Sequence, residues 1–237
     1  MTSQLVALEF DANDPVRLAR FWAGVLGREV AEDGVTLLAG GDTEFQIRFQ
    51  PTDEAKTEPN QMHFDLTSQS LEGQQQKVAK ALELGGRHID IGQTPDDGHV
   101  VLADPEGNEF CVIEPGNNFL ADTGVIGALS SDGSQTVGYF WSEALGWPLV
   151  WDQDEETAIQ SSQGGSKISW GGPPVRPKTA KNRLRLDIAP PAGSDQKTEV
   201  DRLISLGAKR SETDPGEDGS IPMTDPDGNE FTVLAPQ

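Results

Sequence analysis

The sequence predicts an α+β protein of four βαβββ units, arranged as two tandem domains of one kind. The main observation is an internal repeat: Asp-Pro-Glu-Gly-Asn-Glu-Phe at residues 104–110 returns as Asp-Pro-Asp-Gly-Asn-Glu-Phe at 225–231. The pair Phe-Trp at 21–22 recurs at nearly the same offset, at 140–141. A constant offset between separate landmarks indicates a duplicated domain. The predicted organisation is domain 1 at 1–116, a linker at 117–123 and domain 2 at 124–237.

The first unit opens with a strand and a helix that both have clear signals. Residues 5–10 read as a strand, and Asp14-Pro15 supplies an N-cap followed by a proline at the first helical position. Helical spacing of apolar residues continues to about residue 26, where Gly27 ends the helix. That apolar stripe consists of Leu18, Phe21, Trp22 and Val25. Short strands are expected at 28–32, 35–39 and 43–50.

The second unit repeats this order after a polar loop at 51–60. A strand is predicted at 61–67 and a helix at 70–84, with Ser70 as its cap and two glycines at its end. The repeated Asp-Pro-x-Gly segment has the residue order of a tight turn, so it joins two closing strands. The strands expected after the helix lie at 87–91, 99–103 and 109–114.

The second half follows the same plan. Helices are predicted at 134–145 and 194–206, and the segment at 171–181 corresponds to the loop at 51–60. Trp147, Trp151 and Trp170 are placed on strands of this half.

Charge and composition limit the function classes. A formal net charge of −21 at pH 7 leaves no basic stripe of the kind that binds nucleic acid. No apolar run reaches the length of a membrane span, and the N-terminus lacks a signal-peptide pattern. The single cysteine, Cys111, excludes an internal disulfide. We therefore expect a cytoplasmic monomer or homodimer whose partner is a small molecule, with neither nucleic acid nor membrane as a partner.

The paired βαβββ units, the Phe-Trp helix ending in Leu-Gly and the closing Asp-Pro-x-Gly-Asn-Glu-Phe hairpin resemble the vicinal oxygen chelate superfamily. This superfamily includes glyoxalase I, bleomycin-resistance proteins and extradiol dioxygenases, and the likeness is strongest to its two-domain glyoxalase-like proteins. The resemblance implies that paired units curl into cups, which hold a divalent metal in enzymatic members. It covers nearly the whole chain, yet its motifs specify the fold rather than the chemistry.

The resemblance also implies where metal ligands would lie. In the first half the positions are Ala7, Gln46 or Arg48, His63 and Cys111. In the second half they are Ile126, Ile168 or Trp170, Arg185 and Thr232. A catalytic site needs about three good ligands and one open position. Because His63 and Cys111 are the only weak candidates, we expect no catalytic metal.

Strand alternation places three candidate chemical groups of the first half toward a cup: His63, Asp65 and Glu9. His63 is a candidate ligand, hydrogen-bond donor or general base, with Glu9 as a possible partner in acid–base catalysis. The alternative is a histidine held by Asp65. Glu9 and Asp65 are together candidates for holding a cation, against the alternative of solvated or hydrogen-bonded acids.

Three further residues are candidates for binding an organic ligand. Trp170 supplies an aromatic wall if it faces a cup, and core packing is the alternative. Arg48 and Arg185 point into the cups, where they pair with acids or with an anionic ligand. For Cys111 the alternative to a ligand is an inert core residue.

Two functions compete on this basis. The first is a glyoxalase-like small-molecule-binding protein without a catalytic metal, which sequesters an aromatic or drug-like compound. The alternative is a lyase or isomerase of the glyoxalase type, using either acid–base catalysis or a divalent metal such as Zn, Ni, Mn or Fe. A third possibility is that side chains fill the cups.

Overall fold

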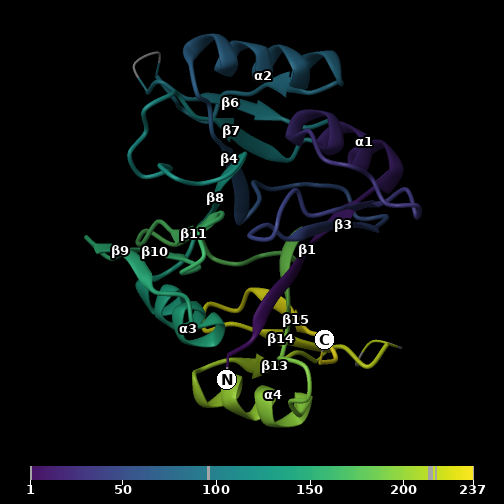
Figure 1. The fold of residues 1–237 in the computed structure, drawn as a ribbon, viewed down its shortest axis with the longest axis vertical. Helices are drawn as coiled ribbons and strands as arrows, with labels where there is room; N and C mark the ends of the chain where they lie inside the picture. Colours follow the sequence, from purple (N-terminus) through teal and green to yellow (C-terminus); the bar gives the residue numbers. More distant parts are fainter. Residues whose placement is uncertain (1, 95–96, 213–215, 217, 237) are drawn as a thin grey trace.

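The computed structural model describes residues 2–94, 97–212, 216 and 218–236, and these residues form two mixed β-sheets with four helices (Figure 1). The helices are α1 (Pro15–Leu26), α2 (Leu71–Glu83), α3 (Gln135–Leu145) and α4 (Gln196–Ser205). The first sheet contains β1 (Gln4–Ala12), β2 (Thr36–Leu37), β3 (Gln46–Pro51), β12 (Leu184–Ala189), β13 (Lys209–Arg210), β14 (Ile221–Thr224) and β15 (Glu230–Val233). The second contains β4 (Met62–Leu66), β5 (Arg87–His88), β6 (Val100–Ala103), β7 (Glu109–Val112), β8 (Ile126–Ser131), β9 (Leu149–Gln153), β10 (Glu156–Gln160) and β11 (Lys167–Trp170).

Each sheet takes strands from both halves of the sequence. The seven-stranded sheet has the order β13-β14-β15-β12-β1-β3-β2, and the eight-stranded sheet has the order β5-β6-β7-β4-β8-β11-β10-β9. Within each sheet, strands of the two sequence halves meet at one antiparallel pair. This pair is β1–β12 in the seven-stranded sheet and β4–β8 in the eight-stranded sheet. The first unit therefore shares a sheet with the fourth, and the second with the third. The two halves are sequence repeats, but neither half builds a sheet of its own.

The helix ends follow the predicted signals with small shifts. The Asp14 side chain accepts a hydrogen bond from the Arg17 amide at the start of α1, and Gly27 closes this helix in the left-handed conformation at φ 69°. The strand expected at 28–32 is reduced to a single bridge between Val30 and Leu37. The helix expected at 194–206 is α4, which begins at Gln196 with Asp195 as its N-cap.

The repeated hairpin is the most heavily bonded part of the fold. Asp104 is fully buried and accepts hydrogen bonds from the Trp22 indole at 3.2 Å, from the Glu106 amide and from the amide and side chain of Asn108. The Phe110 ring packs 4.9 Å from the Trp22 ring, edge to face. In the second copy, Asp225, Trp141, Asn229 and Phe231 repeat these contacts. The motif therefore ties each closing hairpin to the helix of the neighbouring unit.

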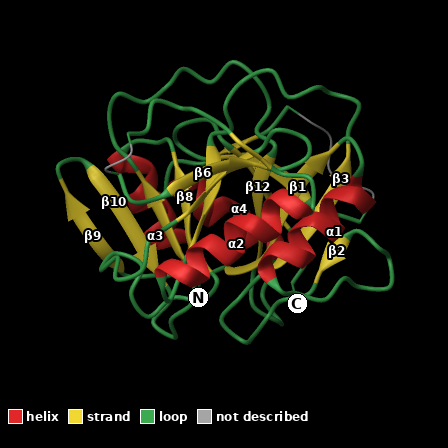
Figure 2. Cartoon of the chain, turned by 90° about the horizontal axis from the view of Figure 1, so that it is seen from above, coloured by secondary structure: helices red, strands yellow, loops and turns green. Residues whose placement is uncertain are grey.

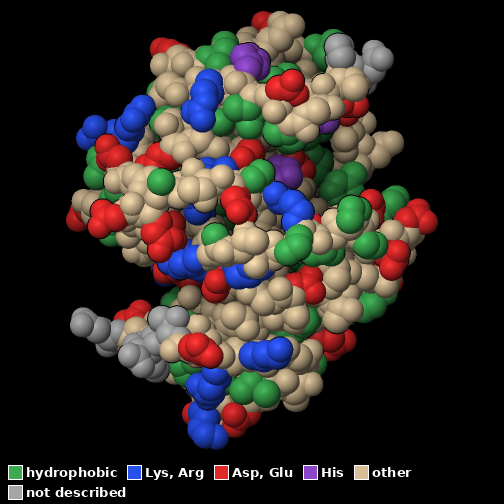
Figure 3. All heavy atoms as spheres, turned by 180° about the vertical axis from the view of Figure 1, so that it is seen from behind, with side chains coloured by type: hydrophobic (Ala, Val, Ile, Leu, Met, Phe, Trp, Pro, Cys, Tyr) green, Lys and Arg blue, Asp and Glu red, His purple; other side chains and the backbone are tan. Residues whose placement is uncertain are grey.

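One apolar cluster runs beneath both sheets, and the helices cover it. Figure 2 shows α1 and α2 side by side in one layer, and these helices contact each other. Acidic and basic side chains are interspersed on the face seen in Figure 3, and the acids do not gather in one patch there. Among the described residues, no helix is both long enough and apolar enough to cross a membrane.

Candidate functional site

The face of each sheet that points away from the helices carries the polar residues. We call these faces the seven-stranded cup and the eight-stranded cup. Cross-strand partners share a face, so pairing defines the members of each cup. The seven-stranded cup contains Ala7, Glu9, Gln46, Arg48, Arg185, Asp187 and Thr232. The eight-stranded cup contains His63, Asp65, Cys111, Ala128, Ser130, Lys167 and Ser169.

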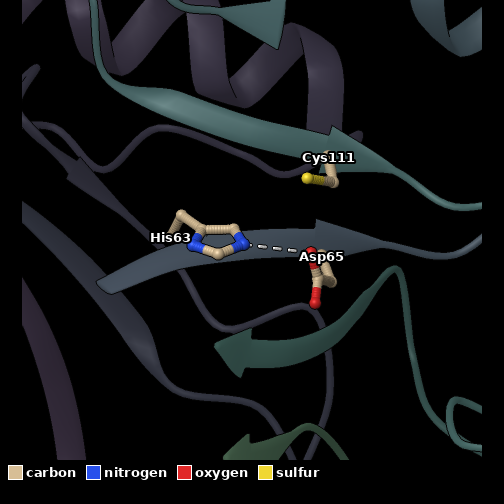
Figure 4. Close-up of side chains that lie close together, drawn as sticks. All are labelled: His63, Asp65 and Cys111. Atoms are coloured by element: carbon tan, nitrogen blue, oxygen red, sulfur yellow. Dashed lines mark ion pairs between the residues drawn. The ribbon is translucent and has the colours of Figure 1, made fainter. Parts of the chain in front are cut away.

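The eight-stranded cup brings His63, Asp65 and Cys111 together (Figure 4). His63 and Asp65 lie two residues apart on β4, and Cys111 lies opposite Asp65 on β7. His63 Nε2 is 3.4 Å from Asp65 Oδ1, and one donor atom from each of the three residues lies within 4.8 Å of the others. Ser130 donates a 2.5 Å hydrogen bond to Asp65 Oδ2.

The donor set of this cluster fits a divalent metal ion. An imidazole nitrogen, a carboxylate oxygen and a thiolate sulfur are the three ligand types that Zn²⁺ takes in proteins, and three protein ligands leave one position open. Burial, together with the Asp65 charge, raises the pKa of the Cys111 thiol well above its ordinary value. Because a bound metal needs the thiolate, binding here must release a proton. The sequence named only His63 and Cys111 as weak ligands; the structure adds Asp65.

The predicted linker covers part of this cup. Leu120 is buried against Cys111, Ala128 and neighbouring apolar side chains. The Lys167 amine donates a hydrogen bond to the Phe119 carbonyl oxygen and lies 4.8 Å from the centre of the Phe119 ring. Any ligand of the eight-stranded cup therefore shares its space with residues of the linker.

The seven-stranded cup is dominated by ion pairs. The Arg185 guanidinium donates hydrogen bonds to both Asp11 oxygens, at 2.8 and 2.9 Å, and to Glu9 at 3.0 Å. Burial raises the pKa of Asp11, but hydrogen bonds and charge from Arg185 and Lys181 outweigh it, so the pKa lies below its ordinary value. Both terminal nitrogens of Arg185 are therefore engaged, Nη1 with Asp11 and the Asn182 carbonyl oxygen and Nη2 with Asp11 and Glu9.

Arg48 is less fully engaged than Arg185. Its side chain is 29% exposed, and it reaches Asp187 at 3.4 Å and the neutral Gln46 oxygen at 3.2 Å. Burial and the Glu9 charge raise the pKa of Asp187 to about 7, against the lowering effect of Arg48. Arg48 is thus the cation of this cup that still has N–H groups available to a ligand.

The two cups differ at equivalent positions of the repeat. Where one cup has His63 and Cys111, the other has Arg185 and Thr232. Asp65 and Asp187 correspond, but Ser130 donates to Asp65, whereas the equivalent Glu9 adds a second negative charge near Asp187. The duplication has therefore produced a donor-rich cup and a cup that contains a fixed cation.

Three sequence expectations are corrected by this arrangement. Glu9 and His63 lie in different sheets, so they cannot act together as an acid–base pair. For the same reason Glu9 and Asp65 cannot hold one cation jointly. Trp170 is 2% exposed and packs in the apolar core with Ile168, because Lys167 and Ser169 are the alternate residues of β11 that face the cup.

Arg48, Arg185, His63 and Asp65 do lie on the cup faces, as strand alternation predicted. Sequence reasoning did not single out Asp11, Lys167 or Asp187 as members of a site. Alternation within β12 was the available signal for Asp187, since it lies two residues after Arg185.

Comparisons with known proteins agree with this architecture. The model of the glyoxalase-like domain matches the chain twice, over residues 7–113 and 128–234. Glyoxalase I from Zea mays has a similar structure, with a TM-score of 0.65 at 14% identity over 99% of this chain and 92% of that one. A putative dioxygenase from Bacillus subtilis gives a TM-score of 0.65 at 13% identity, covering 99% of this chain and 85% of that one. No curated protein sequence matches the chain.

Proposed function

Because the chain belongs to the glyoxalase-like domain family, whose fold does not fix the chemistry, we propose that it binds a small organic anion in the seven-stranded cup without a metal there. The observation that carries this proposal is the pair of arginines on that face. Arg185 stands at a position where the family resemblance expects a metal ligand. Arg48 presents a partly exposed guanidinium beside it.

The charges of the seven-stranded cup argue against a cation and for an anion. A divalent metal would need Glu9, Asp11 or Asp187 as a ligand, and each of these carboxylates already pairs with an arginine at 3.4 Å or less. A metal ion at the same carboxylates would lie close to the guanidinium and be repelled by it. A ligand carboxylate instead meets Arg48, whose planar donors suit carboxylate geometry.

Removing Arg48 is expected to weaken anion binding. We predict that EDTA-treated protein binds a member of a panel of benzoate, mandelate, succinate and benzenesulfonate in isothermal titration calorimetry. Arg48→Met should weaken that binding at least tenfold, about 1.4 kcal/mol, because it removes the charged partner. Lys80→Met on the exposed face of α2 is the matched control and should bind like the parent. The proposal fails if no probe binds, or if binding requires an added metal.

A second candidate function is metal-assisted lyase or isomerase chemistry in the eight-stranded cup. The observation that favours it is the grouping of His63, Asp65 and Cys111. A metal held there would polarise a carbonyl or hydroxyl oxygen of a substrate. The chain's own groups would fix its position: Ser130 orients the Asp65 carboxylate, and Asp65 orients the His63 ring.

The second candidate predicts a thiolate–metal bond. Co²⁺ added to EDTA-treated protein should produce a sulfur-to-metal charge-transfer band in the near ultraviolet, with release of protons. Cys111→Ser should remove the band, and His63→Ala should weaken the metal affinity by 10-fold or more. His88→Ala, at an exposed histidine on β5, should leave both unchanged. Absence of the band at millimolar Co²⁺ would exclude the site.

A further inference from the structure

We infer that anion binding in the seven-stranded cup is coupled to the uptake of one proton by Asp187, because the ligand and Asp187 compete for the Arg48 guanidinium. The inference rests on the proposed function and adds to it a ligand class and a pH response. It has three requirements. The negative charge of Asp187 must have few stabilising contacts, Arg48 must be the cation that a ligand can draw away from it, and a ligand must have room beside Arg48.

The Asp187 carboxylate is buried with few partners. The residue is 1% exposed, its Oδ2 meets Arg48 at the long distance of 3.4 Å, and its Oδ1 has no hydrogen-bond partner. An ionised carboxylate in such a place is costly, because a buried charge needs a close counter-charge and several hydrogen bonds. Any weakening of the ion pair with Arg48 therefore favours the protonated form of Asp187.

The other groups of the cup cannot replace Arg48. From β1, Glu9 adds negative charge next to Asp187 and raises its pKa further. From β12, Arg185 is committed to Glu9 and Asp11. β15 contributes the hydroxyl of Thr232, whose hydrogen bond lowers the pKa of Asp187 but which carries no charge. Around the rim, Asp33 and Asp218 lie within the electrostatic reach of Arg48 and add negative charge.

Space for a ligand lies at the edge of the seven-stranded sheet beside Arg48. A hollow of about 500 Å³ is bounded by Arg48, by the polar residues Asp33, Thr36 and Gln50, and by apolar residues next to β2, on β3 and at the start of α1. Those apolar side chains are Pro15, Val16, Val35, Phe49 and Pro51. This volume is within the range of small-molecule pockets. A charged group at Arg48 with an apolar body in the hollow describes an aromatic or aliphatic carboxylate.

The direction of the coupling follows from the shared guanidinium. With Asp187 near pKa 7, it is protonated at pH 6, where Arg48 is free for a ligand. It is ionised at pH 8, where it competes for Arg48. A bound anion neutralises Arg48 and so raises the pKa of Asp187, and by reciprocity protonation of Asp187 strengthens anion binding. Affinity should be constant below about pH 6 and fall by up to tenfold per pH unit above 7.

Benzenesulfonate is the probe that tests this coupling, because it stays ionised throughout the range. Its affinity and enthalpy for EDTA-treated protein should be measured by calorimetry from pH 5.5 to 8.5, at each pH in two cationic buffers: Bis-Tris and imidazole at the lower pH values, triethanolamine and Tris at the higher ones. The two buffers have different ionisation enthalpies, so their difference gives the number of protons taken up. We expect uptake to rise from near zero at pH 5.5 toward one proton at pH 8, with the loss of affinity given above.

Asp187→Asn should bind the probe with an affinity that does not change with pH, close to that of the parent at pH 5.5. His88→Gln, at an exposed histidine on β5, is the control and should keep the full pH dependence. If Asp187→Asn does not fold, the proton count of the parent protein decides alone. Binding of the probe without proton uptake overturns this inference and leaves the proposed function standing, whereas absence of binding at every pH overturns both.

Discussion

Asp104→Asn is expected to lower the free energy of unfolding by about 3 kcal/mol, since each buried polar group left without a partner costs roughly 1–3 kcal/mol. The substitution keeps the shape of the side chain. It replaces one carboxylate oxygen by an NH₂ group, in a site where every neighbour is a donor: the Trp22 indole and the amides of Glu106 and Asn108. At least one donor loses its acceptor. Urea unfolding monitored by circular dichroism measures the change.

The pH dependence of the Asp104 variant has a definite sign. Burial raises the pKa of Asp104 to about 6, although hydrogen bonds from Asn108, Glu106 and Trp22 oppose the shift. A raised carboxyl pKa stabilises the fold below its unfolded value near 4, and this contribution is lost as pH rises through 6. The destabilisation should therefore be larger at pH 5 than at pH 7.

The second copy of the hairpin supplies a matched test of the same idea. Asp225→Asn should behave like Asp104→Asn, because burial raises the pKa of Asp225 to about 6 and Trp141 donates to it. Glu83→Ala, at a side chain that is 70% exposed, should change stability by less than about 0.5 kcal/mol. An effect below 1 kcal/mol at both aspartates would show that the hairpin motif is not the anchor described above.

Arg185→Met is expected to lower the free energy of unfolding by roughly 3–5 kcal/mol, the usual effect of removing one partner from a buried ion pair. The side chains of Arg185 and Asp11 are 8% and 7% exposed, so the carboxylate cannot recover its hydration. Lys181 also reaches Asp11, but its side chain is 49% exposed and it has no contact with Glu9. Denaturant unfolding at pH 7 provides the measurement.

Measuring the free energy of unfolding of Arg185→Met as a function of acid pH distinguishes two effects. One is the loss of the ion pair, and the other is the loss of packed side-chain volume. The pKa of Asp11 lies below its unfolded value near 4, so its contribution is present at neutral pH and lost as pH falls below 4. Arg185→Met should flatten this acid limb, and the double change with Asp11→Leu should recover much of the stability at pH 7. If the double variant is no more stable than Arg185→Met, the ion pair is not the cause.

The elements were predictable where local chemistry decides them. Asp14, Pro15 and Gly27 specify the ends of α1 within a few residues, and the repeated Asp-Pro-x-Gly turn specifies both closing hairpins. The short strand expected at 28–32 failed because only Val30 finds a partner. Its existence depends on an edge contact, which local sequence does not encode.

The sequence predicted which residues face a cup, but not which of them lie in the same cup. Alternation placed His63, Asp65, Arg48 and Arg185 on cup faces, and all four lie there. The repeat could not tell whether the first unit pairs with the second or with the fourth, since all four share one pattern. The β1–β12 and β4–β8 pairings separate Glu9 from His63 and gather the arginines in one cup. Trp170 was misplaced for a different reason: either alternate set of β11 offers a plausible cup residue, and core packing against α3 selects between them.

The difference between the cups suggests how duplication changes chemistry on one fold. A single position holds His63 in one copy and Arg185 in the other. The first offers an imidazole nitrogen as a metal ligand, and the second supplies a permanent positive charge. Such a substitution changes the class of ligand that a cup of this fold can hold.

Side-chain NMR of the arginines tests the central claim most directly. EDTA-treated, ¹⁵N-labelled protein is titrated with benzenesulfonate at pH 6, and the Nε–H signals are assigned by comparison with Arg48→Met. The account predicts a saturable shift of the Arg48 signal, with no metal added and with the His63 ring signals unchanged. A response confined to His63, or one that appears only after Zn²⁺ is added, would contradict it and assign the ligand to the eight-stranded cup.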